Sequence, residues 1–409
     1  MNRRSFLKTL APAACLALPR LATAALPKAK ITRVRIYRPP DLNPLFNQSN
    51  MLVTVETDAG ITGIGEGGVK DTLEQCAGSL IGKDPFKIEA IWQEEYMNYF
   101  YPPGREKQDA MGALDLALWD IKGKALGLPI HEILGGAVRN YCECYNTGNV
   151  RPPSRGGAQP TVKDRVQATL EAGYKLYRIG AADPGSGPWD VRKRLIQLAK
   201  EAKEIREALG DSGDWSVDFH QRFEYDDALR GCKLIEEYSP YLVEDPVRDE
   251  HFLQDIPKLR RMTTVPIAAG EEWGWRWDFS PLVENHDIDY NRVTLPNPGG
   301  ITEYLKIMAM CETHAVGLVP HFTGPVATAA LVHCLATYPG SVMFEYNYSD
   351  RKIPYLPEYT DFKGGKLYPN ERPGLGVTLD MKPLTQIGEV TQPVRRQIYN
   401  RPDGSLTHW

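Results

Sequence analysis

Three acidic residues follow short apolar runs at nearly equal spacing in the middle of the chain. They are Asp218 in Trp-Ser-Val-Asp218, Glu244 in Tyr-Leu-Val-Glu244 and Glu271 in Ile-Ala-Ala-Gly-Glu271. The intervals of 26 and 27 residues (244 − 218 and 271 − 244) match a strand, a helix and two loops. A single acid of this kind is usually a helix N-cap or a solvated loop charge, whereas three at one period favour a shared site. Three hard oxygen donors suit Mg²⁺ better than zinc, which prefers nitrogen and sulfur.

Two histidines are candidates for acid–base chemistry beside these acids. His220 is two residues beyond Asp218, so on a strand both side chains can point to the same side. His321 follows the predicted seventh strand, 317–319, across the mouth of the predicted barrel. Histidine transfers protons in either direction near neutral pH. The alternative for each residue is a core or supporting histidine.

From residue 141 onward, strand-like and helix-like segments alternate and would position these groups. Strand candidates are 142–146, 175–179, 216–218, 242–244, 267–270, 292–294, 317–319 and 342–346, and helical patterns fill the gaps. Eight parallel strands with helical crossovers predict an α/β fold, with a TIM-like (β/α) barrel over 141–350 as the catalytic domain. The acids would lie at the C-terminal ends of its strands, where such barrels carry their active sites.

A second domain is expected before the barrel, because 409 residues exceed a single hydrophobic core. Residues 31–37, 51–57 and 61–66 alternate as antiparallel strands, and three helical segments follow them. We therefore predict an N-terminal α+β capping domain over 26–140. The turn-rich segment 351–409 is expected to return to it.

Residues 1–25 have the composition of an export signal. Arg3-Arg4-Ser-Phe-Leu-Lys8 precedes a modest apolar run and Ala22-Thr-Ala24. The pattern resembles a twin-arginine signal peptide and predicts a periplasmic or secreted location, the alternative being a basic, frayed helix. Six cysteines remain after the predicted cleavage, mostly within apolar patterns where cysteine acts as a small core residue. No zinc site is predicted, even at Cys142-Glu-Cys144.

The composition describes an ordinary globular protein, with 42% hydrophobic and 24% charged residues. The net charge of −4 gives no reason to expect nucleic acid or an acidic membrane surface as a partner. No apolar run beyond residue 25 is long enough to span a bilayer. We expect a small-molecule substrate as the partner, and a homo-oligomer.

Six motifs are spread over the chain beyond residue 25. They are Asp218-Phe-His220, Glu244-Asp-Pro, Gly270-Glu271, Pro298-Gly-Gly-Ile-Thr302, Pro320-His321 and the helical run 114–127. Together they resemble the enolase superfamily, in its mandelate racemase and muconate lactonizing enzyme branch, and most of all its acid-sugar dehydratases of the galactonate and mannonate type. The resemblance implies that Asp218, Glu244 and Glu271 bind Mg²⁺. It also implies that Glu345, on the eighth strand, donates a hydrogen bond to an enediolate, for which its carboxyl must be protonated.

Two positions depart from the family pattern. Many members carry Lys-x-Lys at the end of the second strand, where this chain has Arg178-Ile-Gly180. Glycine offers no base and arginine stays protonated, so Arg178 is expected to bind the substrate carboxylate or to stabilise charge. Thr294 stands where an aspartate usually pairs with the seventh-strand histidine, and a hydroxyl cannot stabilise an imidazolium as a carboxylate does. Which of His220 and His321 is the base therefore stays open.

The function implied by the resemblance is Mg²⁺-dependent dehydration of an aldonate or similar sugar acid to a 2-keto-3-deoxy acid. Removing the α-proton of a carboxylate creates a dianionic enediolate, which a divalent cation stabilises. One histidine would take that proton, and the other would protonate the departing β-hydroxyl. Two alternatives stay open: a racemase, epimerase or cycloisomerase acting on a hydroxy acid or lactone, and a non-catalytic periplasmic sugar-acid receptor. Residues 43–50 and 99–105 are expected to touch the substrate.

Overall fold

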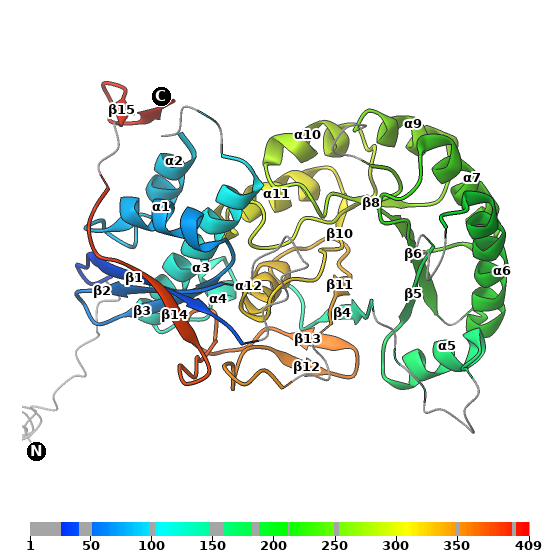
Figure 1. The fold of residues 1–409 in the computed structure, drawn as a ribbon, viewed down its shortest axis with the longest axis horizontal. Helices are drawn as coiled ribbons and strands as arrows, with labels where there is room; N and C mark the ends of the chain where they lie inside the picture. Colours follow the sequence, from blue (N-terminus) through cyan, green and yellow to red (C-terminus); the bar gives the residue numbers. More distant parts are fainter. Residues whose placement is uncertain are drawn as a thin grey trace, which may run out of the picture.

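The protein folds into two lobes, which Figure 1 shows side by side. The computed structural model describes residues 26–40, 51–97, 101, 103–147, 150, 152, 159–181, 188–211, 213–248, 253–347, 352–394 and 398–408. The smaller lobe, the capping domain, is coloured blue to cyan and includes the red C-terminal end. The larger lobe, the barrel, is coloured green to yellow.

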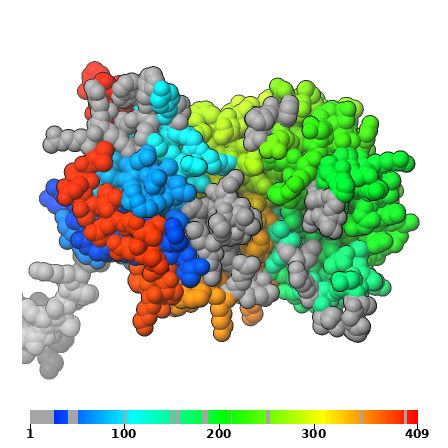
Figure 2. Space-filling view, in the orientation of Figure 1, coloured from blue at the N-terminus to red at the C-terminus, as the bar shows by residue number. Residues whose placement is uncertain are grey.

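The capping domain contains an antiparallel sheet in the order β14-β1-β2-β3. Its strands are β1 (Ile31–Arg38), β2 (Leu52–Thr57), β3 (Thr62–Glu66) and β14 (Thr385–Val390). Val34 on β1 pairs with Val55 on one side and with Val390 on the other, which lines up apolar side chains across the sheet. The C-terminal segment therefore returns to the capping domain, and Figure 2 shows it in red over the edge of the blue N-terminal part.

Helices α1 (Lys70–Leu80) and α3 (Arg105–Leu126) pack against this sheet, and α2 (Ile88–Met97) packs against both of these helices. Helix α3 lies directly on β3 because two glycines leave room for its backbone. A Cβ atom on Gly63 would lie 2.0 Å from the carbonyl oxygen of Ala117, and one on Gly65 would lie 1.8 Å from that of Ala113. Helix α3 ends at Gly127, which adopts a φ of 68° that favours glycine.

Eight short strands of the described residues form the barrel. They are β4 (Cys142–Tyr145), β5 (Leu176–Gly180), β6 (Asp214–Asp218), β7 (Leu242–Glu244), β8 (Ile267–Ala269), β9 (Tyr290–Asn291), β10 (Gly317–Leu318) and β11 (Phe344–Glu345). The six strands from β5 through β10 pair in parallel, each with the next along the chain, and β11 pairs in parallel with β4. A parallel bridge from Leu318 to Val342 connects these two groups. The predicted α/β fold, a TIM-like barrel with an N-terminal capping domain, is confirmed.

Helices precede, connect and cover the barrel strands. They are α4 (Ile130–Ile133), which lies before β4, α5 (Val162–Glu171), α6 (Val191–Leu209), α7 (Tyr225–Ile235) with the 3₁₀ turn η1 (Glu236–Tyr238), α9 (Asp255–Met262), α10 (Arg276–Glu284), α11 (Ile301–Thr313) and α12 (Pro325–Ala336). Helix α6 buries one stripe, formed by Leu195, Leu198, Ala202, Ile205 and Leu209, at spacings of three and four. Helix α12 is buried on every side, because it contacts both β3 of the capping domain and β4 of the barrel.

The chain beyond the barrel forms two hairpins. In the first, β12 (Asp361–Lys363) pairs with β13 (Lys366–Tyr368), and β13 then pairs antiparallel with β4. In the second, β15 (Tyr399–Asn400) pairs with β16 (Leu406–Thr407) beside α2.

Two buried carboxylates of the capping domain hold the N-termini of two barrel helices. Glu66 accepts hydrogen bonds from the backbone N–H groups of Val326 (2.7 Å) and Ala327 (2.9 Å) in the first turn of α12. Asp115 accepts from the backbone N–H (3.1 Å) and the hydroxyl (2.5 Å) of Thr302 in the first turn of α11. These bonds satisfy helix N–H groups that have no partner within the helix, and they fix the cap on the barrel.

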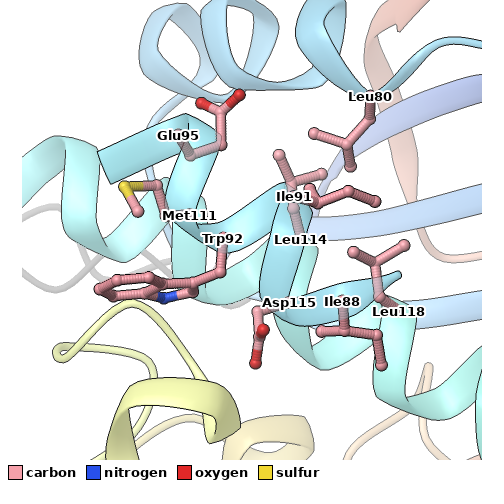
Figure 3. Close-up of a pocket in the computed structure, with 9 residues that line it drawn as sticks. All are labelled: Leu80, Ile88, Ile91, Trp92, Glu95, Met111, Leu114, Asp115 and Leu118. Carbon is pink, nitrogen blue, oxygen red and sulfur yellow. The ribbon is translucent and has the colours of Figure 1, made fainter. Parts of the chain in front are cut away.

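A small cavity lies inside the capping domain, between α1, α2 and α3 (Figure 3). Its lining is mostly apolar and consists of Leu80, Ile88, Ile91, Trp92, Glu95, Met111, Leu114, Asp115 and Leu118. In Figure 3 the two acids, Glu95 and Asp115, lie at opposite ends of this group. The space is about that of one water molecule, so it is too small to hold a sugar acid.

The sixth barrel strand lies earlier in the chain than predicted. Strand β9 is Tyr290–Asn291, whereas the sequence predicted 292–294. Arg292, which the prediction placed at the start of the strand, lies fully buried just beyond the strand end. The six described cysteines are all buried, as expected of core residues. The boundaries at 140 and 350 stay predictions.

Candidate active site

The three predicted acids lie together at the C-terminal ends of neighbouring strands. Asp218 ends β6 and Glu244 ends β7, and the two are paired in the parallel ladder. Glu271 lies two residues beyond β8. Their side chains are 7%, 0% and 12% exposed, so all three carboxylates are withdrawn from bulk water.

The backbone turns sharply just after these strands. His220, Gln221 and Asp245 have φ values of 51°, 55° and 37°, which non-glycine residues rarely adopt. Gly270 has a φ of 111°, and a Cβ atom there would lie 2.5 Å from the Phe279 ring. Such strained backbone is concentrated at functional sites. Strand alternation does not place His220 beside Asp218, because β6 ends at Asp218 as predicted and the chain then turns through a left-handed conformation.

Glu271 brings the two predicted histidines together. His220 Nε2 lies 3.9 Å from one oxygen of Glu271, and His321 Nε2 lies 3.7 Å from the other. The side chain of His220 is 56% exposed and that of His321 only 15%, so His220 faces solvent and His321 is more enclosed. Within the described part of the chain, His321 Nδ1 and Thr294 Oγ1 are buried without a hydrogen-bond partner.

Arg178 contacts the carboxylates from β5. Its Nη2 group donates to Asp218, and it lies 3.3 Å from an oxygen of Glu244. Only 11% of its side chain is exposed. The guanidinium therefore neutralises part of the charge of two carboxylates, which agrees with the predicted charge-stabilising role of Arg178 and leaves that role a prediction.

A second arginine, which the sequence analysis did not single out, lies deeper in the site. Arg292 is fully buried and donates to Asp245 at 3.0 Å, to Glu271 at 2.9 Å and to Glu345 at 3.1 Å. It also donates to the Tyr145 hydroxyl at 2.8 Å. The one signal in the sequence was a charged residue inside a predicted barrel strand, at 292–294.

Glu345, at the end of β11, is also buried in this site. One oxygen accepts from Arg292 at 3.1 Å and from the backbone N–H of Phe322 at 3.3 Å, and the other accepts from the hydroxyl of Thr147. Donation to a substrate would require a proton on one of these oxygens. Its predicted donor role stays a prediction.

Opposing effects set the protonation of the acids. Burial raises the pKa of Glu271, but the charges of His321 and Arg292 outweigh it and lower this pKa to about 2. Burial likewise raises the pKa of Glu244, while Arg292 and Arg178 lower it below its ordinary value. For Asp218, burial dominates and raises the pKa. Nearby positive charge is thus what keeps two of the three buried carboxylates ionised.

The donor set fits Mg²⁺ in chemistry. Asp218, Glu244 and Glu271 offer carboxylate oxygens from three adjacent strand ends, with no thiolate among them. Among the residues that the structure describes, no group of three His, Cys, Asp or Glu side chains is arranged to hold a metal ion. The guanidiniums of Arg178 and Arg292 lie against the oxygens that would do so.

One of the segments predicted to touch substrate is partly described. Residues 43–50 lie outside the described residues, as do 99, 100 and 102. Arg105, at the start of α3, donates to the backbone oxygen of Trp273 at 2.9 Å, two residues beyond Glu271. The capping domain therefore reaches the loop that carries one of the predicted metal ligands.

Comparison with known proteins places both lobes in one family. Residues 161–383 match the enolase C-terminal domain-like family, and residues 40–135 match the N-terminal domain of mandelate racemase and muconate lactonizing enzyme. A D-galactonate dehydratase from Pectobacterium atrosepticum is 33% identical over 93% of this chain and 100% of its own length.

Solved structures agree with this relationship. An enolase from Pantoea ananatis with bound D-gluconate and Mg is 26% identical, with a TM-score of 0.76 over 87% of this chain and 94% of that one. An L-talarate dehydratase from a Polaromonas species, complexed with Mg and L-glucarate, is also 26% identical, with a TM-score of 0.73 over 88% of this chain and 99% of that one.

The chain belongs to the mandelate racemase and muconate lactonizing enzyme branch of the enolase superfamily. Within it, the chain is an acid-sugar dehydratase, a hydro-lyase, of a family that depends on Mg²⁺. The predicted family, enzyme class and cofactor are confirmed. The alternatives of a racemase or cycloisomerase and of a sugar-acid receptor give way to this class.

The predicted periplasmic or secreted location is wrong. The relatives that match over their whole length are galactonate dehydratases, which are typically cytoplasmic enzymes. The pattern behind the twin-arginine prediction is confined to residues 1–25, which lie outside the described residues. Such a short basic and alanine-rich pattern is a weak signal, because packing against the fold does not constrain it. None of the helices in the described ranges has the length and apolar character needed to cross a membrane.

Proposed function

We propose that the chain removes water from an aldonate, a sugar acid with hydroxyls at C2 and C3, and releases a 2-keto-3-deoxy acid. The galactonate dehydratase relatives and the structure with bound D-gluconate support an aldonate, and the structure with bound L-glucarate, a diacid, supports the wider class of acid sugars. The observation that carries the proposal is the approach of His220 and His321 to the two oxygens of Glu271. Two imidazoles beside one predicted metal ligand can serve as a base and an acid for the same substrate.

We assign Asp218, Glu244 and Glu271 as the residues that hold Mg²⁺. Mg²⁺ supplies the positive charge that stabilises the negative charge developing on the substrate carboxylate. Arg178 adds a fixed positive charge beside Asp218 and Glu244. Because the site is buried, the electrostatic effects of Mg²⁺ and of Arg178 would be larger there than in water.

We assign His321 as the base and His220 as the acid. His321 is the more enclosed of the two, and its Nε2 takes the proton from C2, which leaves the electron pair in an enediolate. His220 donates a proton to the C3 hydroxyl, the C3–O bond breaks, and water leaves towards the solvent side that His220 faces. The resulting enol loses its C2 hydroxyl proton and gains a proton at C3, which gives the 2-keto-3-deoxy acid.

The end of β5 favours dehydration over racemisation. Gly180 ends that strand, where many relatives of this branch carry a basic lysine, and it has no side chain to act as a base. One base on one face of C2 is sufficient for dehydration, whereas racemisation needs groups on both faces.

The proposal is tested by incubating the protein with a library of aldonates and aldarates, with galactonate and gluconate first, in D₂O containing Mg²⁺. We expect a 2-keto-3-deoxy acid, identified by NMR and mass spectrometry, with deuterium at C3. Exchange of the C2 proton with no loss of water from any acid sugar would contradict dehydration.

The predicted homo-oligomer also stays a prediction, which light scattering on the purified protein tests.

A further inference from the structure

Arg292 is a fully buried cation surrounded by acids. It donates to Asp245, Glu271 and Glu345 at 2.9 to 3.1 Å, and Nη1 lies 3.4 Å from an oxygen of Glu244. Burial works against its charge, but Glu244, Tyr145, Glu345 and Asp245 raise the pKa of the guanidinium well above its ordinary value. All its nitrogen donors point at partners that also belong to the candidate site or adjoin it.

Asp245 fixes this arginine and one strand end at the same time. One of its oxygens accepts from Arg292 Nε at 3.0 Å, and the other accepts from the backbone N–H of Gly270 at 3.1 Å. Gly270 directly precedes Glu271, so the same carboxylate orients both the arginine and the residue that Arg292 contacts. Asp245 itself adopts a φ of 37°, a strained conformation that the surrounding bonds must hold in place.

Tyr145 closes the network on the side of β4. Its hydroxyl donates to Glu244 at 2.7 Å and accepts from Arg292 at 2.8 Å. Glu244 is thereby held by a neutral donor as well as by the charge of Arg292. Side chains on or just beyond β4, β7, β8 and β11 are thus joined through one guanidinium.

We propose that Arg292, held by Asp245, is a positioning residue that fixes Glu244, Glu271 and Glu345 for the binding of Mg²⁺ and of the substrate. This inference rests on the proposed function, because it takes Glu244 and Glu271 to be metal ligands. Residues that orient metal ligands are as important to a metal site as the ligands, since an unsupported ligand loses its geometry.

Charge explains why a cation is needed here. Asp218, Glu244, Asp245, Glu271 and Glu345 bring five carboxylates into one buried region, against the two guanidiniums of Arg178 and Arg292. Without Arg292, Glu271 and Glu345 would lose the donor that they share. The planar fork of arginine contacts several carboxylates at once, which the single ammonium of lysine cannot do.

A second arginine–aspartate pair, at the other end of β9, provides a control. Arg260 donates to Asp289 at 2.9 Å, and Asp289 precedes β9, whereas Arg292 follows it. The two arginine–aspartate pairs therefore lie at opposite ends of one strand, and only the Arg292 pair adjoins the predicted metal ligands. Arg260→Gln removes an arginine–aspartate ion pair of similar length, although a more exposed one, at the end of β9 away from the predicted metal ligands.

The test is the affinity for Mg²⁺ alone, measured by titration calorimetry on the full chain without substrate. We expect Arg292→Gln and Asp245→Asn to weaken Mg²⁺ binding by about 10- to 100-fold, the usual effect of losing such a partner. Arg292→Lys should recover part of this loss, and Arg260→Gln should bind Mg²⁺ as the wild type does. Asp245→Asn keeps an acceptor for Gly270 and tolerates a positive φ, so it tests the charge with little change to the backbone.

Thermal melts by circular dichroism show which variants are folded. If Arg292→Gln does not fold, Arg292→Lys and Asp245→Asn still test whether Arg292 positions the metal ligands. Unchanged or tighter Mg²⁺ binding by a folded Arg292 or Asp245 variant, beside a wild type that binds, would overturn the positioning role alone. A wild type that binds no Mg²⁺, or a Glu244→Gln variant that binds it normally, would overturn the proposed metal site and this inference with it.

Discussion

His321 Nε2 lies 3.7 Å from an oxygen of Glu271, beyond hydrogen-bonding distance but within the range of a strong charge interaction. The other ring nitrogen, Nδ1, is buried, and the described residues provide no partner for it. The charge that stabilises a protonated His321 therefore comes from the metal-ligand side of the ring. This arrangement differs from the family pattern, in which an aspartate at the position of Thr294 would supply that charge.

Replacing the proposed base should stop both turnover and proton exchange. His321→Asn is expected to lower kcat by about 10²- to 10⁴-fold, the usual contribution of a general base. Exchange of the substrate C2 proton in D₂O, followed by NMR, should be lost to the same extent. Exchange that survives in this variant would move the role of base to His220.

Replacing the proposed acid should separate the two steps. His220→Asn is expected to lower the rate of dehydration by about 10²- to 10⁴-fold, while the C2 proton still exchanges with D₂O. The physical reason is that His321 and Glu271 are untouched, and the exposed His220 contributes only to the leaving group. Parallel loss of exchange and turnover in this variant would contradict the division of labour.

The barrel and its acids could be predicted from the sequence because both depend on local patterns. Strands β5 to β8 coincide with short apolar runs in the sequence. The period of 26 to 27 residues then places Asp218, Glu244 and Glu271 at successive strand ends. The family motifs added Glu345 and His321, and the structure places both with the three acids.

The sequence could not predict the contacts that depend on backbone conformation or on distant partners. The positive φ of His220 turns it off the strand, and nothing in Asp-Phe-His indicates a left-handed residue. Arg292 lies within a predicted strand. Its contacts could not be foreseen, because its partners Asp245, Glu271 and Glu345 lie 47, 21 and 53 residues away in the sequence. Pairings of this kind become visible only when the strand ends meet in space.

Removing one charge from the predicted metal site should abolish activity and leave the barrel folded. Glu244 is fully buried and accepts from Tyr145 and Arg178, and Glu244→Gln keeps its volume while removing its charge. We expect loss of Mg²⁺ binding by calorimetry, no detectable turnover, and an unchanged circular dichroism spectrum. Chelation of Mg²⁺ from the wild type should likewise stop turnover. Full activity in the presence of the chelator would contradict the metal site.

The contact between the capping domain and the barrel should make stability depend on pH through Glu66. Burial raises the pKa of Glu66 to about 8, although the backbone N–H groups of Ala327 and Val326 lower it in part. One oxygen accepts both N–H groups, and the other is buried with no partner among the described residues, which suits a carboxyl that carries a proton. The folded protein therefore holds a proton that the unfolded chain releases near its ordinary pKa of 4.5.

The contribution of Glu66 to stability is complete below pH 4.5, where both states are protonated, and it falls as the pH rises towards about 8. The free energy of unfolding should fall over this range by up to about 1.4 kcal/mol per pH unit from this group. Glu66→Gln keeps an oxygen for the two N–H groups of α12 and does not titrate, so urea unfolding across this range should show a shallower dependence on pH. Glu56→Gln, in the same sheet but 23% exposed, is the matched control and should keep the wild-type dependence. Equal pH dependence in the Glu66→Gln variant and the wild type would show that Glu66 is already ionised in the folded protein.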